Sequence, residues 1–267
     1  MTAYGSALEG FSRGSFTARG KSRDVYRMGA GPAVIVISEL PGITPLVAAF
    51  GRRVADAGCT AVMPHLFGDP GRPPTAGYLL KSTSYACISR EFAMFAKRKT
   101  SPVTDWLRDL ARAEHESCGG PGVGVVGMCL TGGFALAMMV DDVVLAPVLS
   151  QPSLPAGLNA SFRSDLGISD GDLARVKERC AGGQQVLGLR FTGDTLSPPD
   201  RFERLRGELG DAFIGVEIDS SKGNPDGYRT AAHSVLTEDL KDDDGSASKG
   251  ALDQVIGFFR EKLAVTG

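Results

Sequence analysis

A cysteine in a glycine-rich turn is the part of this sequence that most directly indicates chemistry. Residues 123–133 read Val-Gly-Val-Val-Gly-Met-Cys-Leu-Thr-Gly-Gly, with Cys129 between two apolar runs. The β-branched run before it predicts a buried strand, and the Ala- and Met-rich run from Phe134 to Val140 predicts a helix. A residue between such a strand and helix sits on a sharp turn that exposes its side chain, and the helix amides can stabilise negative charge there. The pattern therefore favours Cys129 as a nucleophile.

A thiol nucleophile needs a base, and the base needs a carboxylate that orients it. Of the three histidines, His233 follows the last predicted strand, His115 lies in a charged helix, and His65 follows an earlier strand. His233 is the best candidate base. His65 is expected by default to be a structural residue at a strand end, with a place in the pocket wall as the alternative. Asp194 ends the strand before, although an Asx turn or a helix cap would also explain it. The order Cys129, Asp194, His233 fits a triad assembled at the ends of successive strands.

The elements that must position these residues alternate along the chain. The runs Ala33 to Ser38 and Thr60 to Met63 predict buried parallel strands, and a helix that begins near Pro45 lies between them. The same periodicity predicts helices around 103–114, 172–180, 199–209 and 252–263, and strands at 143–149, 185–192 and 213–218. Such a series predicts an α/β fold with a mostly parallel central sheet and helices on both faces.

The domain organisation is predicted to be simple. No linker divides residues 1–267, so we expect one domain, with 1–15 as a flexible N-terminal arm. The Gly- and Pro-rich stretch 67–77 is expected to form a surface loop. The acidic stretch 238–245 is expected to form a second loop, with its charges solvated.

Composition narrows the classes of function. The 267 residues carry a net charge of −2 and 42% hydrophobic residues, which gives no basic surface for nucleic acid. No apolar run reaches the roughly 18 residues of a membrane span, and residues 1–27 contain no continuous apolar run of the kind a signal peptide has. The five cysteines are an odd number without zinc-ligand spacing. We therefore expect a cytoplasmic monomer or homodimer that acts on a small molecule, with no metal, cofactor, nucleic-acid or membrane partner.

Four segments together resemble the dienelactone hydrolase family, a cysteine-nucleophile branch of the α/β-hydrolases. They are Gly-Met-Cys-Leu at 127–130, Gly-Asp at 193–194, Ala-His-Ser at 232–234 and Val-Ile-Ser-Glu-Leu-Pro-Gly at 36–42. The resemblance covers about residues 16–265. Its most distinctive marks are the cysteine in the turn and Glu39 after the first core strand, because most α/β-hydrolases use serine as the nucleophile.

The resemblance implies an α/β-hydrolase fold and hydrolysis of a small ester or lactone through a thioester. It implies a triad with Cys129 as nucleophile, His233 as base and Asp194 as the orienting carboxylate. It also implies that Glu39 hydrogen-bonds the resting thiol and helps to activate it, and that the amides of Leu40 and Leu130 form an oxyanion hole. Taken without the family, Glu39 could equally be an ion-pair or capping residue at a strand end.

The sequence departs from the family pattern in two places. Thr131 stands where the turn would have its second glycine. The arginines that clamp the carboxylate of a dienelactone are not plainly present, so Arg90 and Ser234 are the candidate substrate-binding residues, and Arg90 is equally well a surface charge. Two alternatives therefore stay open. One is an acyltransferase or thioesterase with the same triad, and the other is a non-catalytic small-ligand-binding protein in which Cys129 is a packing residue.

Overall fold

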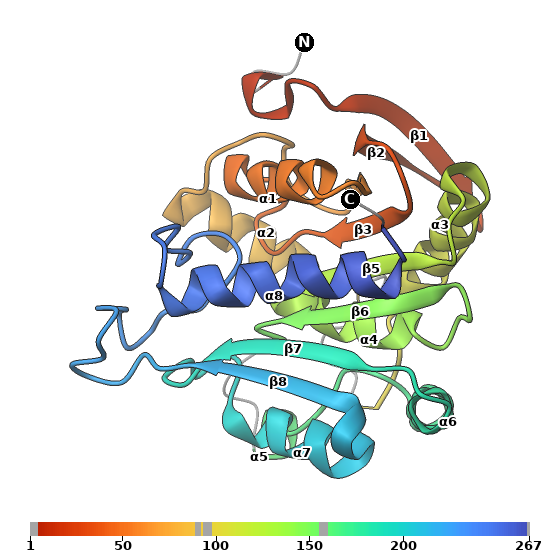
Figure 1. Cartoon of the computed structure of the whole chain (residues 1–267). Helices are drawn as coiled ribbons and strands as arrows, with labels where there is room; N and C mark the ends of the chain where they lie inside the picture. The colour runs from red at the N-terminus through yellow and green to blue at the C-terminus, as the bar shows by residue number, and fades with distance from the viewer. Residues whose placement is uncertain (1–4, 89–91, 93–97, 155–159, 266–267) are drawn as a thin grey trace.

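The computed structural model describes residues 5–88, 92, 98–154 and 160–265, and its centre is an eight-stranded sheet (Figure 1). The strand order is β1-β2-β4-β3-β5-β6-β7-β8. The strands β3 to β8 are parallel, whereas β1 and β2 form an antiparallel edge. Their bounds are β1 Ser12–Ala18, β2 Lys21–Gly29, β3 Ala33–Ile37, β4 Thr60–Pro64, β5 Val123–Met128, β6 Val144–Ser150, β7 Val186–Phe191 and β8 Phe213–Ile218. The predicted α/β fold with a mostly parallel sheet is confirmed.

Helices cover both faces of this sheet (Figure 1). One face carries α1 (Pro45–Asp56) and α8 (Ala247–Lys262). The other carries α3 (Pro102–Cys118), α4 (Gly132–Met138), α6 (Asp170–Ala181) and α7 (Pro199–Leu209). The remaining helices are α2 (Ala76–Ile88), α5 (Ala160–Arg163) and the 3₁₀ turns η1 (Gly5–Leu8), η2 (Cys129–Thr131) and η3 (Gly210–Ala212). None of the helices in the described ranges has the length and apolar character that a membrane crossing requires.

The central strands are buried on both faces because each contributes to two cores. In β3, Val34 and Val36 pack in the cluster under α1 and α8, while Ile35 and Ile37 pack in the cluster under α3 and α4. Successive side chains of a strand point to opposite faces, so a strand between two helical layers must be apolar throughout. This is why an uninterrupted run of Ala, Val and Ile predicted the element so well.

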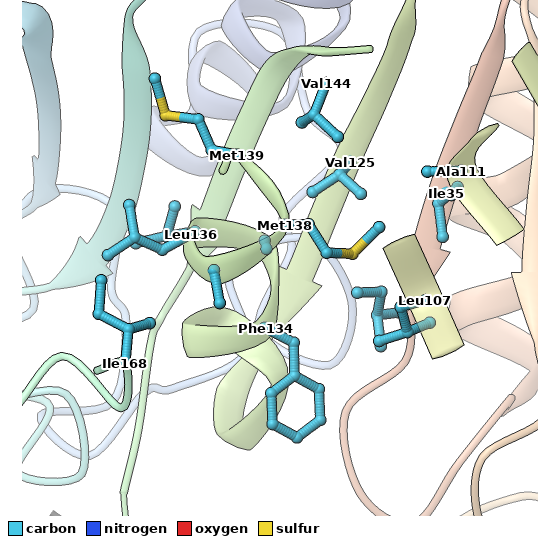
Figure 2. Close-up of a cluster of buried hydrophobic side chains, with 14 of the residues drawn as sticks. Ile35, Leu107, Ala111, Val125, Phe134, Leu136, Met138, Met139, Val144 and Ile168 are labelled. Carbon is cyan, nitrogen blue, oxygen red and sulfur yellow. The ribbon is translucent and has the colours of Figure 1, made fainter. Parts of the chain in front are cut away.

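The short helix α4 is packed against the strand that precedes it and against α3. Figure 2 shows Phe134 and Met138 on α4, with Val125 of β5 and Leu107 of α3 beside them in the same cluster. All four side chains are almost completely buried. Dense packing of this kind leaves the start of α4 little freedom to move, and the turn that carries Cys129 lies directly before it.

The elements that the sequence did not predict include a hairpin and a helix of three turns or more. The first is the β1–β2 hairpin, and residues 12–15 of the expected N-terminal arm lie in β1. Its side chains are mostly exposed, so the alternation of a half-buried strand is weak. The hairpin is held by α3, where Trp106 stacks edge-on with Phe16 and donates from Nε1 to the carbonyl of Lys21 at 3.1 Å. The second is α2, which begins within the stretch expected to be a loop.

Candidate active site

Glu39 and the three expected triad residues follow strands at the carboxyl edge of the sheet. Glu39 follows β3, Cys129 follows β5, Asp194 follows β7 and His233 lies in the long segment after β8. Because β3, β5, β6, β7 and β8 are neighbours in the sheet, the loops after them meet at one edge. The chain thereby gathers residues that are far apart in sequence.

The turn at Cys129 is strained and tightly fitted. Cys129 has a φ of 56°, in the left-handed region that non-glycine residues seldom adopt. Gly127 must be a glycine, because a Cβ there would lie 2.1 Å from the carbonyl oxygen of Thr131. Gly132 has the same constraint, since its Cβ would meet Pro152 at 2.7 Å. A strained nucleophile held by close backbone packing is typical of a functional turn.

Thr131, which departs from the family pattern, holds this turn in place. Its Oγ1 accepts a hydrogen bond from the amide of Met128 at 2.8 Å. The same hydroxyl lies 2.9 Å from the carbonyl oxygens of both Ile37 and Met128, and its single proton is shared between these two acceptors. The Thr131 side chain therefore stabilises the turn, because its hydroxyl links the turn that carries Cys129 to the end of β3.

His233 and Asp194 form a hydrogen-bonded pair. The Nδ1 of His233 donates to Asp194 Oδ2 at 2.6 Å. The other carboxylate oxygen of Asp194 accepts from the amide of Leu196 at 2.9 Å, so the carboxylate is fixed at both ends. The backbone amide of His233 donates to Asp239 Oδ2 at 2.8 Å. These contacts leave the Nε2 atom of the imidazole for the reacting groups.

The charge state of His233 depends on Cys129. Burial opposes the imidazolium, but the negative charge of a Cys129 thiolate and the hydrogen bond to Asp194 outweigh it and raise the pKa of His233 to about 11. The Nε2 atom is buried and has no hydrogen-bond partner within the described part of the chain. The imidazole of His233 is therefore held through Nδ1, and its Nε2 is available to react. Because Cys129 is close enough to shift the pKa of this imidazole, Nε2 can transfer a proton to or from the thiol.

Glu39 is buried and is held by neutral donors. Its Oε2 accepts from Ser234 Oγ at 2.7 Å and from Gln151 Nε2 at 3.1 Å, and its Oε1 accepts from Thr237 Oγ1. The hydrogen bond to the thiol that the family resemblance implies for Glu39 is not among those that the described residues make. Glu39 instead joins the end of β3 to the segment that carries His233.

Gln151 and Arg201 are parts of the site that the sequence did not reveal. Gln151 follows β6 with a φ of 36° and is completely buried, and its position directly after a core strand is the signal that could have found it. Arg201 lies on α7, where an arginine is normally expected to be solvated. It is nevertheless buried, which lowers the pKa of its guanidinium to about 10 despite the nearby carboxylates.

The Arg201 guanidinium joins two loops of the site. It donates to backbone carbonyl oxygens at distances between 2.7 and 3.4 Å, namely those of Pro152, Phe162, Asp165 and Leu196. Ser153, next to Pro152, donates its amide to the carbonyl of Cys129 at 2.9 Å. The cation therefore links the segment that supports Cys129 to the loop that carries Asp194.

A cavity of about 410 Å³ opens over these residues. Cys129, His233, Glu39 and Ser234 line it together with the two expected oxyanion residues, Leu40 and Leu130. Glu238 also lines it, although we expected the acidic loop to be merely solvated. Much of the remaining wall is apolar, with further contributions from Pro41, Pro74, Leu79, Leu154 and Leu196.

Two other sequence candidates are not part of this arrangement. Arg90 lies outside the described residues. His65 lines a separate cavity of about 350 Å³, and its Nε2 donates to the carbonyl of Gly68 at 2.8 Å. His65 therefore has a local structural partner, as expected by default, and does not line the cavity over Cys129.

Comparisons with known proteins show which sequences and folds this chain is similar to. A model of the dienelactone hydrolase family matches residues 23–160, more than half of the chain. A curated protein of Saccharomyces cerevisiae, "Putative carboxymethylenebutenolidase", is 25% identical over 240 residues, which cover 87% of this chain and 79% of that protein.

Solved structures show the same fold. A "Putative Dienelactone Hydrolase" from Klebsiella pneumoniae has a TM-score of 0.62 at 19% identity, covering 94% of this chain and 98% of that one. A dienelactone hydrolase-like promiscuous phosphotriesterase from metagenomic libraries has a TM-score of 0.59 at 17% identity, with coverage of 94% and 98%. At these identities the structural likeness concerns the fold alone.

Proposed function

Because the chain belongs to the dienelactone hydrolase family and is a hydrolase of that family, we propose that it cleaves a small ester or lactone through a thioester on Cys129. The observation that carries this proposal is the His233 to Asp194 hydrogen bond of 2.6 Å, beside a cysteine on a strained turn in the same cavity. The substrate is a small molecule, because the cavity has room for little more than an acyl group and its leaving group.

In the first half of the reaction, the Cys129 sulfur attacks the carbonyl carbon and the carbonyl oxygen becomes an oxyanion. His233 Nε2 takes the proton of the Cys129 thiol as the sulfur becomes the attacking thiolate, and the negative charge of that thiolate raises the pKa of His233, which favours the imidazolium. Backbone amides of Leu40 and Leu130 stabilise the oxyanion. The bond from carbon to the leaving oxygen then breaks, and His233 Nε2 gives its proton to that oxygen.

In the second half, water replaces the alcohol. His233, now neutral, takes a proton from the water while the water oxygen attacks the thioester carbonyl. The bond from carbon to sulfur breaks, which releases the carboxylic acid and restores the thiolate and imidazolium pair. For a lactone the leaving oxygen remains attached to the acyl group, so the product is a single hydroxy acid or its keto form.

The proposal is tested by kinetics and by labelling of the thiol. Cys129→Ala and His233→Ala should each reduce kcat/KM for para-nitrophenyl butyrate and for simple lactones by roughly a thousandfold or more. Cys118→Ala is the matched control, since burial raises the pKa of that thiol and it lies at the end of α3. Turnover that persists in either triad variant would refute the proposed triad.

Mass spectrometry tests the covalent intermediate directly. An activated ester mixed with the enzyme and quenched in acid should leave an acyl group on the peptide that contains Cys129. Iodoacetamide should alkylate the same residue before Cys59, Cys118 or Cys180, because burial raises the pKa of those three thiols. An inert Cys129 in an inactive protein would favour the non-catalytic ligand-binding alternative.

A further inference from the structure

The cavity over Cys129 carries an excess of negative charge. Its described lining residues include two carboxylates, Glu39 and Glu238, and no lysine or arginine. The partners of Glu39 are two hydroxyls and an amide, so no cation within the described ranges is hydrogen-bonded to it. The buried Arg201 does not line the cavity, and its hydrogen bonds described above go to backbone carbonyls.

Glu238 is the second carboxylate in the wall of the cavity. Its side chain lines the cavity and is exposed to solvent over part of its surface. Partial burial and the charges of Glu39 and Asp239 raise the pKa of Glu238, which is the direction expected for a carboxylate that faces other carboxylates. The nearby Arg229 is paired with Asp239 at 2.7 Å.

Much of the rest of the wall is apolar, and part of it is exposed on the surface. Leu79 and Leu196 line the cavity while remaining 42% and 41% exposed, and Leu80, next to Leu79, is 70% exposed. Exposed leucines around the mouth of a cavity offer a surface to an apolar chain that extends beyond the reacting carbonyl. A carboxylate on that chain would have to leave water and approach Glu238 and Glu39.

We propose that this cavity takes esters or lactones with an uncharged, apolar acyl group, and that Glu238 discriminates against acyl groups that carry a carboxylate. The inference rests on the proposed ester or lactone hydrolysis and deepens it by specifying the charge of the substrate. The proposed specificity differs from that of an enzyme that binds an anionic lactone. Such an enzyme needs a cation to bind the carboxylate of its substrate, whereas the described wall of this cavity carries carboxylates.

The test compares two substrates with the same acyl chain and leaving group, mono-para-nitrophenyl adipate, which ends in a carboxylate, and methyl para-nitrophenyl adipate, in which a methyl ester removes that charge. The full-length protein should hydrolyse the neutral diester with a kcat/KM at least roughly tenfold higher than that for the monoacid, as expected for like charges near a partly solvated site. Equal or faster hydrolysis of the monoacid would overturn the inference while leaving ester hydrolysis intact. If Cys129→Ala abolishes hydrolysis of both esters, the result supports the proposed ester hydrolysis by Cys129. If the parent protein hydrolyses neither ester faster than Cys129→Ala does, the proposed ester hydrolysis is refuted.

Variants locate the source of the discrimination. Glu238→Gln should lower the neutral-to-anionic ratio of kcat/KM severalfold, mainly by improving the monoacid. Glu116→Gln is the matched control, because it removes the same charge far from the cavity. Glu116 lies near the end of α3, which leads into the start of β5, whereas the cavity lies beyond the carboxyl end of β5. An unchanged ratio in Glu238→Gln would refute the role of Glu238. A selective loss of monoacid hydrolysis in Arg90→Ala would show that an arginine binds the carboxylate, and this too would overturn the inference.

Discussion

The hydroxyl of Thr131 gives the sharpest prediction about how the nucleophile turn is held. Thr131→Val keeps the shape and the β-branch of the side chain but removes Oγ1. The amide of Met128 then loses the acceptor at 2.8 Å, and the carbonyl of Ile37 loses a donor at 2.9 Å. Both Met128 and Thr131 are completely buried, so water cannot replace the missing partner.

The size of the effect follows from these contacts. An unsatisfied buried amide costs about 1–3 kcal/mol, and the lost donation to a carbonyl adds about 1 kcal/mol or less, since only one hydroxyl proton is available. The extra methyl group returns part of this through apolar burial. We therefore expect Thr131→Val to reduce the free energy of unfolding by about 2–3 kcal/mol, which lowers Tm by about 4–8 °C for a chain of this size.

The assay is urea unfolding followed by fluorescence of Trp106, together with kcat/KM for a para-nitrophenyl ester. Thr131→Ser keeps the hydroxyl and loses only a methyl group, so it should retain more activity than Thr131→Val despite leaving a small void. An unfolding free energy within about 0.5 kcal/mol of the parent protein, with unchanged kcat/KM for Thr131→Val, would refute the reasoning.

Two further predictions concern the base and the buried cation. The negative charge of a Cys129 thiolate and the hydrogen bond to Asp194 together raise the pKa of His233 from 6.5 to about 11, and Asp194→Asn removes the second of these causes. A histidine whose pKa is higher in the folded than in the unfolded protein contributes its full stabilisation at pH values below the unfolded-state pKa. This stabilisation declines as the pH rises towards the folded-state pKa. The loss of stability in Asp194→Asn should therefore be larger at about pH 6 than at about pH 9. Arg201→Met leaves several backbone carbonyls without donors and should lower the free energy of unfolding by about 2–4 kcal/mol and kcat/KM with it.

Each of these has a control in the same protein. NMR titration of His233 in the Asp194→Asn variant should show a lower pKa, and a stability loss that grows with pH would contradict the linkage argument. For Arg201, the control is Arg204→Met on the same helix, whose guanidinium is partly exposed and donates to the carbonyl of Ser164 at 3.2 Å. Equal losses of stability in the two arginine variants would rule out a special role for the buried one.

Local sequence was sufficient for the elements whose residues are buried on both faces. The runs that became β3 and β5 are almost uninterrupted Ala, Val, Ile and Gly, and burial of both faces imposes that composition whatever the neighbouring strands are. The β1–β2 hairpin was not predicted, because an exposed edge strand is stabilised by its partners and by Trp106 rather than by its own apolar pattern.

The sequence by itself also determined which residues stand at strand ends, and so it predicted that Cys129, Asp194 and His233 would gather at one edge. Only the tertiary structure decided their partners. Glu39 bonds to Ser234, almost two hundred residues away in the chain, instead of to the thiol. Glu238 borders the cavity although its surrounding acidic run is typical of a solvated loop. Strand ends can be found locally because hydrophobic periodicity is local, whereas hydrogen-bond partners and the charge of a cavity depend on how distant loops pack.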